Sequence, residues 1–93
     1  LMQNYPNPFN PETWIPYQLA HDTDVQITIY DTTGALVRRL NLGHQGAGYY
    51  DTRHKAAYWD GRNESGESVS SRLYFYHLRA GDYIATRRMV ILK

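Results

Sequence analysis

Polar and apolar residues alternate along most of this chain, and no segment carries an apolar stripe at helical spacing. In residues 25–31, Val25, Ile27 and Ile29 fall on one side of an extended strand, and polar residues separate them. We expect strands at residues 14–20, 25–31, 35–42, 55–60, 70–78 and 83–92. About seven short strands of this kind predict an all-β fold in which two antiparallel sheets pack face to face.

Proline and glycine mark where the strands weaken or turn. Pro16 has no amide hydrogen, so residues 14–20 are predicted to form an edge strand. The glycines of residues 43–53 predict a loop or a frayed edge. Residues 31–34 are predicted to close a hairpin and residues 60–66 to form a turn, because Asp, Asn and Gly favour turns.

The beginning of the chain is a separate segment rich in Pro and Asn. Its prolines at positions 6, 8 and 11 forbid a helix and a continuous sheet ladder. We therefore divide the chain into an extended strap, residues 1–13, and a β-sandwich, residues 14–93. Leu1, Tyr5 and Phe9 favour a strap that docks on a face of the domain over the alternative of an unattached linker. The asparagines are interpreted as turn caps rather than as ligand contacts.

Length, charge and cysteine content limit the kinds of partner and site that the chain can have. A chain of 93 residues holds one domain with one core. A formal charge of +1, with the charges dispersed, argues against a nucleic-acid partner held by phosphate neutralisation. The absence of cysteine excludes a disulfide scaffold, a Cys-based zinc site and a cysteine nucleophile. We expect no membrane insertion, because the longest purely apolar run, residues 89–92, is too short to span a bilayer.

The start of the chain shows no charged-then-apolar leader, and its first residue is Leu rather than Met. We interpret the sequence as an excised piece of a longer protein whose other domains precede residue 1.

No motif in the chain carries catalytic chemistry. Residues 66–70 match a serine nucleophile elbow only in part, because the last glycine is missing and no helix is expected to follow. The glycines of residues 43–48 lack the Lys-Ser and the helix of a phosphate-binding loop. Histidines stand at positions 21, 44, 54 and 77, and no pair has metal-ligand spacing on one element. We therefore expect no enzyme activity, no cofactor and no metal.

The turn at residues 60–67 is the one place where oxygen ligands gather. Asp60, Asn63, Glu64 and Glu67 have oxygens suited to Ca²⁺, but Arg62 stands where an EF-hand loop needs a ligand. The alternative is a hairpin turn that uses these residues for their backbone behaviour. The sequence favours the turn and does not decide whether it binds Ca²⁺.

An ordered set of motifs runs through the whole chain. They are residues 3–13 (QNYPNPFNPET), Ile29-Tyr30-Asp31 with Gly34 and Val37-Arg38, Ala47-Gly48, Trp59-Asp60-Gly61, Gly66, Val69-Ser70-Ser71, Tyr74-Phe75-Tyr76, Gly81, Arg88-Met89 and Lys93. In this order they resemble the C-terminal sorting domains of the type IX (Por) secretion system and the related immunoglobulin-like domain of the flagellar hook-capping protein. Arg72 departs from the pattern, because the family usually has Gly there.

The resemblance implies an immunoglobulin-like β-sandwich that sorts a larger exported bacterial protein through the outer membrane to the cell surface or medium, by way of the periplasm. The implied partners are the outer-membrane translocon or its tail-processing component, and we expect a monomer. The last strand is the expected recognition segment, comprising Arg87, Arg88, Met89, Val90, Ile91, Leu92 and Lys93; the alternative is that these residues form only an edge strand.

Two other functions stay open from the sequence. One is a passive immunoglobulin-like structural or adhesive module that binds a protein or glycan, favoured by the tyrosine-rich composition and by Tyr49-Tyr50. The other is a flagellar assembly scaffold. Fold similarity alone does not choose among the three.

Overall fold

The computed structural model describes residues 1–92, which contain strands, turns and extended segments and no helix. No helix in this part of the chain therefore has the length and apolarity to cross a membrane. The strands are β1 (Thr13–Ile15), β2 (Tyr17–Leu19), β3 (Thr23–Tyr30), β4 (Leu36–Gln45), β5 (Gly48–Tyr50), β6 (Ala57–Trp59), β7 (Arg72–Ala80) and β8 (Tyr83–Ile91).

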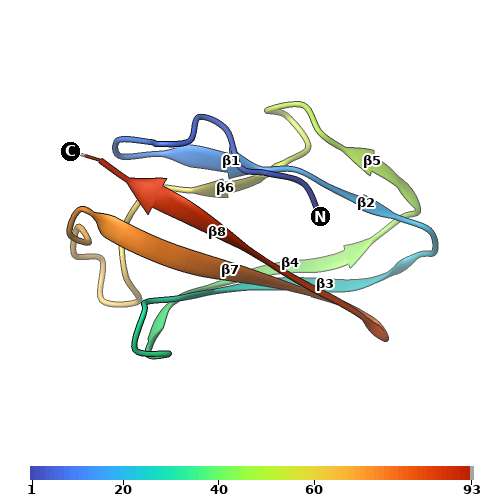
Figure 1. The fold of residues 1–93 in the computed structure, drawn as a ribbon. Coiled ribbons are helices and arrows are strands. Elements are labelled where there is room, and N and C mark those ends of the chain that lie inside the picture. The colour runs from blue at the N-terminus through green and yellow to red at the C-terminus, as the bar shows by residue number, and fades with distance from the viewer. Residues whose placement is uncertain (93) are drawn as a thin grey trace.

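The strands form two layers (Figure 1). One layer is a four-stranded antiparallel sheet in the order β4-β3-β7-β8. The facing layer consists of two separate antiparallel pairs, β1 with β6 and β2 with β5. The predicted sandwich is confirmed. Its second layer is divided because Pro16, which cannot donate to a ladder, interrupts the strand expected over residues 14–20.

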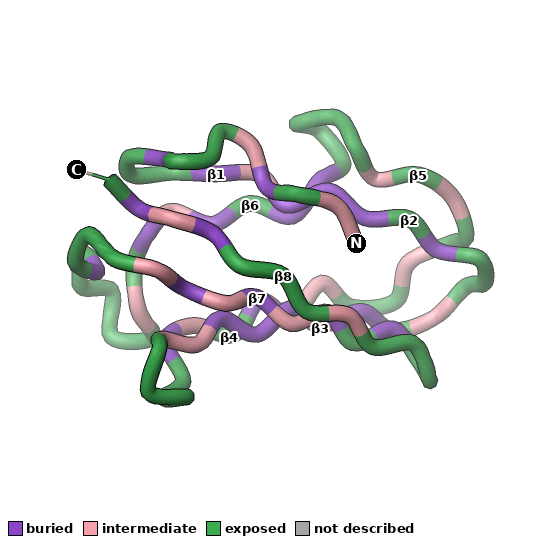
Figure 2. Tube along the Cα trace, viewed as in Figure 1, coloured by how far each residue is buried: buried purple, intermediate pink, exposed green. Residues whose placement is uncertain are grey.

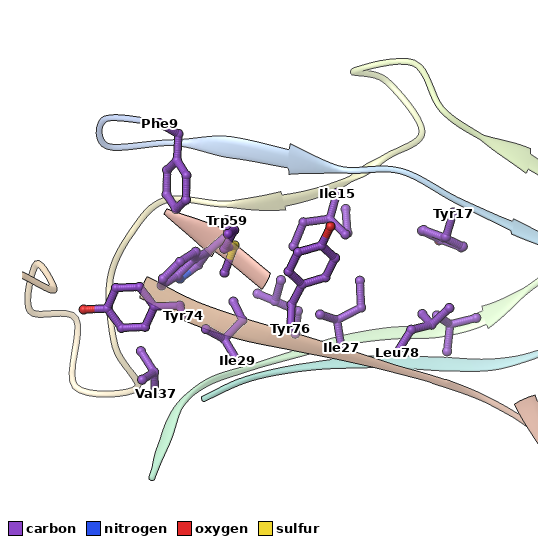
Figure 3. Close-up of a cluster of buried hydrophobic side chains, with 14 of the residues drawn as sticks. Phe9, Ile15, Tyr17, Ile27, Ile29, Val37, Trp59, Tyr74, Tyr76 and Leu78 are labelled. Atoms are coloured by element: carbon purple, nitrogen blue, oxygen red, sulfur yellow. The ribbon is translucent and has the colours of Figure 1, made fainter. Parts of the chain in front are cut away.

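The core lies between the layers and is formed by alternate residues of the long strands (Figure 2). Val25, Ile27 and Ile29 of β3 are buried, as their period-two spacing predicts. Trp59 is fully buried at one end of the core, where its ring meets Phe9 and Tyr74 edge to face, with centroids 5.7 and 5.9 Å away (Figure 3).

The glycine-rich segment is more ordered than its composition predicts. β4 continues to Gln45, and Gly48 to Tyr50 form β5, so the loop expected over residues 43–53 was wrong for these residues. The alternative of an edge agrees with β4 at the outside of its sheet and with β5 as one strand of a two-stranded pair. Tyr50 stacks on Tyr17 of β2, with ring centroids 4.8 Å apart. This stacking gives a short glycine-rich strand an apolar contact that residue alternation within the segment does not reveal.

The predicted hairpin between β3 and β4 is present. One carboxylate oxygen of Asp31 accepts hydrogen bonds from the Thr33 amide, the Thr33 hydroxyl and the Ala35 amide, at 2.9, 2.6 and 3.0 Å. The hydrogen bond from the Thr33 hydroxyl is the main reason that the pKa of Asp31 is lowered. Arg72, where the resembled family has Gly, simply begins β7 opposite Ile91, and none of the described non-glycine residues has a positive φ.

Candidate partner-recognition site

The last strand, β8, is an edge strand of the four-stranded sheet. Its one strand neighbour is β7, and the register pairs Tyr74 with Met89 and Phe75 with Arg88. The side chains of β8 alternate between the core and the outer face, so Met89 and Ile91 are buried while Arg88 is exposed.

The strap closes one end of the outer edge of β8. The Phe9 amide donates to the Val90 carbonyl and the Leu92 amide donates to the Phe9 carbonyl, both at 3.0 Å. The Val90 amide donates to the side-chain oxygen of Asn7 at 3.0 Å. The side-chain amide of Gln3 donates to the Arg88 carbonyl at 2.9 Å. We call residues 88–92 of this edge the closed half.

Buried polar contacts hold the strap in this position. Asn4 is buried, and its side-chain nitrogen donates to the Thr13 hydroxyl at 3.0 Å. The Asn4 amide donates to the Tyr76 hydroxyl at 3.0 Å, and that hydroxyl donates to the Met2 carbonyl at 2.8 Å. Burial raises the pKa of Tyr76, although the Asn4 amide opposes the shift. The strap is therefore packed against the sandwich, with Phe9 in the core.

The other end of the same edge is open. In an antiparallel strand, every second residue directs its backbone amide to the same side. The Val90 amide points away from β7, so the amides of Ile84, Thr86 and Arg88 point away from β7 as well. Within the described part of the chain, no group bonds to these three amides. We call residues 84–88 of this edge the open half. A hollow of about 410 Å³ lies where the two halves meet, lined by Gln3, Phe75, Thr86, Arg87 and Arg88.

The open half is positively charged. Arg87 and Arg88 are exposed on opposite faces of β8, and Arg79 of β7 lies opposite Ile84. Among residues 1–92 the ion pairs are Arg38 with Asp60, at 3.3 Å, and His44 with Asp24, at 3.1 Å. None of the three arginines beside the open half therefore has a carboxylate partner in the described structure.

The predicted recognition segment, residues 87–93, falls into two environments. Arg87, Arg88 and Leu92 are exposed and Val90 is half-buried, whereas Met89 and Ile91 are 0% and 1% exposed in the core. Lys93 lies outside the described residues. The sequence reasoning did not include Ile84 and Thr86, although their position on the predicted last strand was the available signal.

The side chains of the turn considered for Ca²⁺ form hydrogen bonds within the protein. In the turn after β6, the Asn63 side-chain oxygen accepts from the Ser65 and Glu67 amides, and Asp60 accepts from Arg38 and from the Arg62 amide. These bonds are those of a turn. Residues 1–92 contain no group of three or more His, Asp or Glu side chains placed to hold a metal.

Comparison with known proteins places this architecture in a family. The model of the FlgD Ig-like domain matches residues 11–82. A search of curated protein sequences finds no match.

Solved structures share the fold, and two of them are compared with this chain. One is dimeric latent PorU from Porphyromonas gingivalis, with a TM-score of 0.72 and 20% identity over 97% of this chain and 9% of that one. The other is FlgD from P. aeruginosa, with a TM-score of 0.66 and 25% identity over 85% of this chain and 58% of that one. The chain thus spans less than two thirds of either protein. Its family model covers most of the sandwich, and the chain belongs to the FlgD Ig-like domain family.

Proposed function

We propose that this domain is a non-catalytic sorting module that directs a larger exported bacterial protein through the outer membrane by the type IX route. The ordered motifs support this function, because they extend from the strap to β8 and so include both partners of the closed half. The likeness to a small part of a much longer chain supports a module attached to other domains.

The observation that carries the proposal is the half-open edge of β8. A recognition module needs a rigid surface with unused binding groups, and an edge strand with unpaired amides is such a surface. The strap and the core fix the position of β8, so binding of a partner does not include the conformational-entropy cost of ordering this strand. Strand pairing makes and breaks no covalent bond, which agrees with a non-catalytic role.

The partner in this proposal is the outer-membrane translocon or its tail-processing component. The domain folds in the periplasm, is recognised as a monomer, and its parent protein ends in the medium or on the cell surface. Neither nucleic acid nor membrane insertion is part of the proposal.

The test is an export assay in a bacterium that has the type IX system. Residues 1–93 are fused to the C-terminus of a periplasmic reporter, and the reporter is measured in the periplasm, on the surface and in the medium. We expect release or surface display of the fusion and retention of the reporter alone. Retention of the fusion in cells that export a reporter with an established tail would contradict the proposal.

A matched pair of variants tests whether export depends on the folded domain. Trp59→Ala removes the largest core side chain, and Tyr49→Ala removes an aromatic ring that is 66% exposed. We expect export to fail with the first variant and to continue with the second, because a disordered module has no fixed edge to present.

The exposed Tyr49 also supports the alternative of an adhesive module. Its neighbour Tyr50 is engaged, since its ring stacks on Tyr17 and its hydroxyl donates to the Gly46 carbonyl at 2.6 Å. Removing residues 87–93 would delete core residues Met89 and Ile91, so point variants separate the two functions better. Adhesion predicts that Tyr49→Ala abolishes partner binding while Arg87→Glu with Arg88→Glu leaves surface display intact.

A further inference from the structure

The open half of β8 has room for one added strand of limited length. Its outward amides at Ile84, Thr86 and Arg88 are spaced by about 6.8 Å, the repeat of a ladder. The β7–β8 turn, which contains Gly81 and Asp82, bounds it on one side. Gln3, bonded to the Arg88 carbonyl, bounds it on the other.

Both faces of such a strand would meet arginine. Arg88 shares the outer face with Ile84 and Thr86, while Arg87 points to the opposite face. An added strand also alternates, so carboxylates at successive positions would face the two guanidinium groups in turn. Cross-strand pairs of opposite charge are favourable, and like charges placed opposite each other are not.

The hollow at the junction of the two halves favours a side chain with an apolar stem and an acidic head. Phe75 supplies an apolar surface there, and Arg87 and Arg88 supply the charge. Two copies of this edge would instead bring four arginines into one ladder with no carboxylate between them. The charge therefore argues for a different acidic chain and against a second copy.

We infer that the open half of β8 binds an extended acidic segment of a partner protein as a fifth strand of the sheet, with carboxylates of that segment paired to Arg87 and Arg88. This inference rests on the proposed function, because it names the class of partner that the sorting module recognises.

The test uses a displayed library of random twelve-residue peptides, selected on the whole 93-residue protein. We expect the enriched peptides to carry Asp or Glu at neighbouring positions of an extended segment. Addition of such a peptide to the labelled protein should shift the NMR signals of the Ile84, Thr86 and Arg88 amides more than those of the buried strands.

Two pairs of variants locate the binding. Thr86→Pro removes an outward amide of β8 and keeps the backbone bonds to β7, although the 2.8 Å bond between the Thr86 hydroxyl and the His77 ring is lost with it. Asn41→Pro removes an outward amide of β4, the opposite edge of the sheet. We expect Thr86→Pro, and separately Arg87→Glu with Arg88→Glu, to weaken peptide binding about tenfold or more. Asn41→Pro and Arg39→Glu, both on β4, should leave the affinity unchanged.

The inference is overturned if the selection enriches no peptide, if the enriched peptides are neutral or basic, or if their signals map to β4 or to the sheet face. The export assay separates these outcomes from failure of the proposed function. Export that continues with Thr86→Pro contradicts the added strand and leaves the sorting role standing, whereas failure of the unmodified fusion contradicts the sorting role alone.

Discussion

The side-chain oxygen of Asn7 accepts a hydrogen bond from the backbone amide of Val90 at 3.0 Å, across almost the whole length of the chain. Phe9 extends this contact by two backbone bonds, so the strap acts as a short additional strand beside the closed half of β8. The first residues of the chain thereby decide how much of the last strand a partner can reach.

Asn7→Ala should weaken the closed half. The substitution leaves the Val90 amide without its acceptor, which costs about 1 kcal/mol of unfolding free energy. Asn10→Ala is the matched control, because Asn10 is exposed and has no side-chain bond in the described structure. Urea titrations of both variants measure the difference, and an equal loss in the two would contradict the role given to Asn7.

Phe9→Ala should destabilise the domain by about 3–4 kcal/mol, because it leaves a cavity beside Trp59 and detaches the strap from the core. Tyr49→Ala removes a ring of similar size from an exposed position and should change stability by less than about 0.5 kcal/mol. Thermal unfolding followed by Trp fluorescence compares them. A Phe9 variant as stable as the unmodified chain would show that the strap is not part of the core.

Gly61→Ala should be more harmful than Gly34→Ala. Both glycines have positive φ, +77° and +84°, which costs a residue with a Cβ about 1–2 kcal/mol. A Cβ at Gly34 meets open space, whereas one at Gly61 would overlap the backbone carbonyl of Pro11 in the strap. We expect a loss of about 3 kcal/mol at Gly61. Equal losses would show that the strap does not approach this turn closely.

The domain should lose stability at alkaline pH through Tyr17. Burial, with the adjacent Tyr50 hydroxyl, raises the pKa of Tyr17 from its ordinary value of 10.0 to about 12. The folded state thus holds the phenolic proton more tightly than the unfolded state does. This contribution is complete below pH 10 and is lost as the pH rises toward 12.

Chemical denaturation at pH 8 and pH 11 tests this dependence. The loss at pH 11 attributable to Tyr17 is about 1 kcal/mol. Tyr17→Phe keeps the ring against Tyr50 and removes the titrating group, so it should flatten this part of the pH profile. Tyr49→Phe is the control at an exposed position. A steeper profile in the Tyr17 variant would contradict the assignment.

The fold was predictable from local patterns where strands are long and half-buried. The alternation of Val25, Ile27 and Ile29 identified the buried face of β3 correctly. It failed in residues 43–50, because the ladder between β2 and β5 depends on partners distant in the sequence and on the stacking of Tyr50 on Tyr17. Glycine content indicates the conformational freedom of the local backbone, and it gives no information on contacts with residues distant in the sequence.

The site was predictable only in part for the same reason. Residues 89–92 are all apolar, so alternation does not indicate that Met89 and Ile91 are the residues that face the core. The pairing of Asn7 and Phe9 with Val90 has no periodic signal, since it joins an irregular segment to a strand more than 80 residues later. The boundary between the closed and open halves follows from that pairing.

Amide hydrogen exchange along β8 is the most direct test, because both proposals depend on an outer edge that is closed at one end and open at the other. In the free domain, we expect the Val90 and Leu92 amides to be strongly protected by Asn7 and Phe9, and the Thr86 amide to exchange close to its unprotected rate. Equal protection of Thr86 and Val90, or rapid exchange at Val90, would contradict the account.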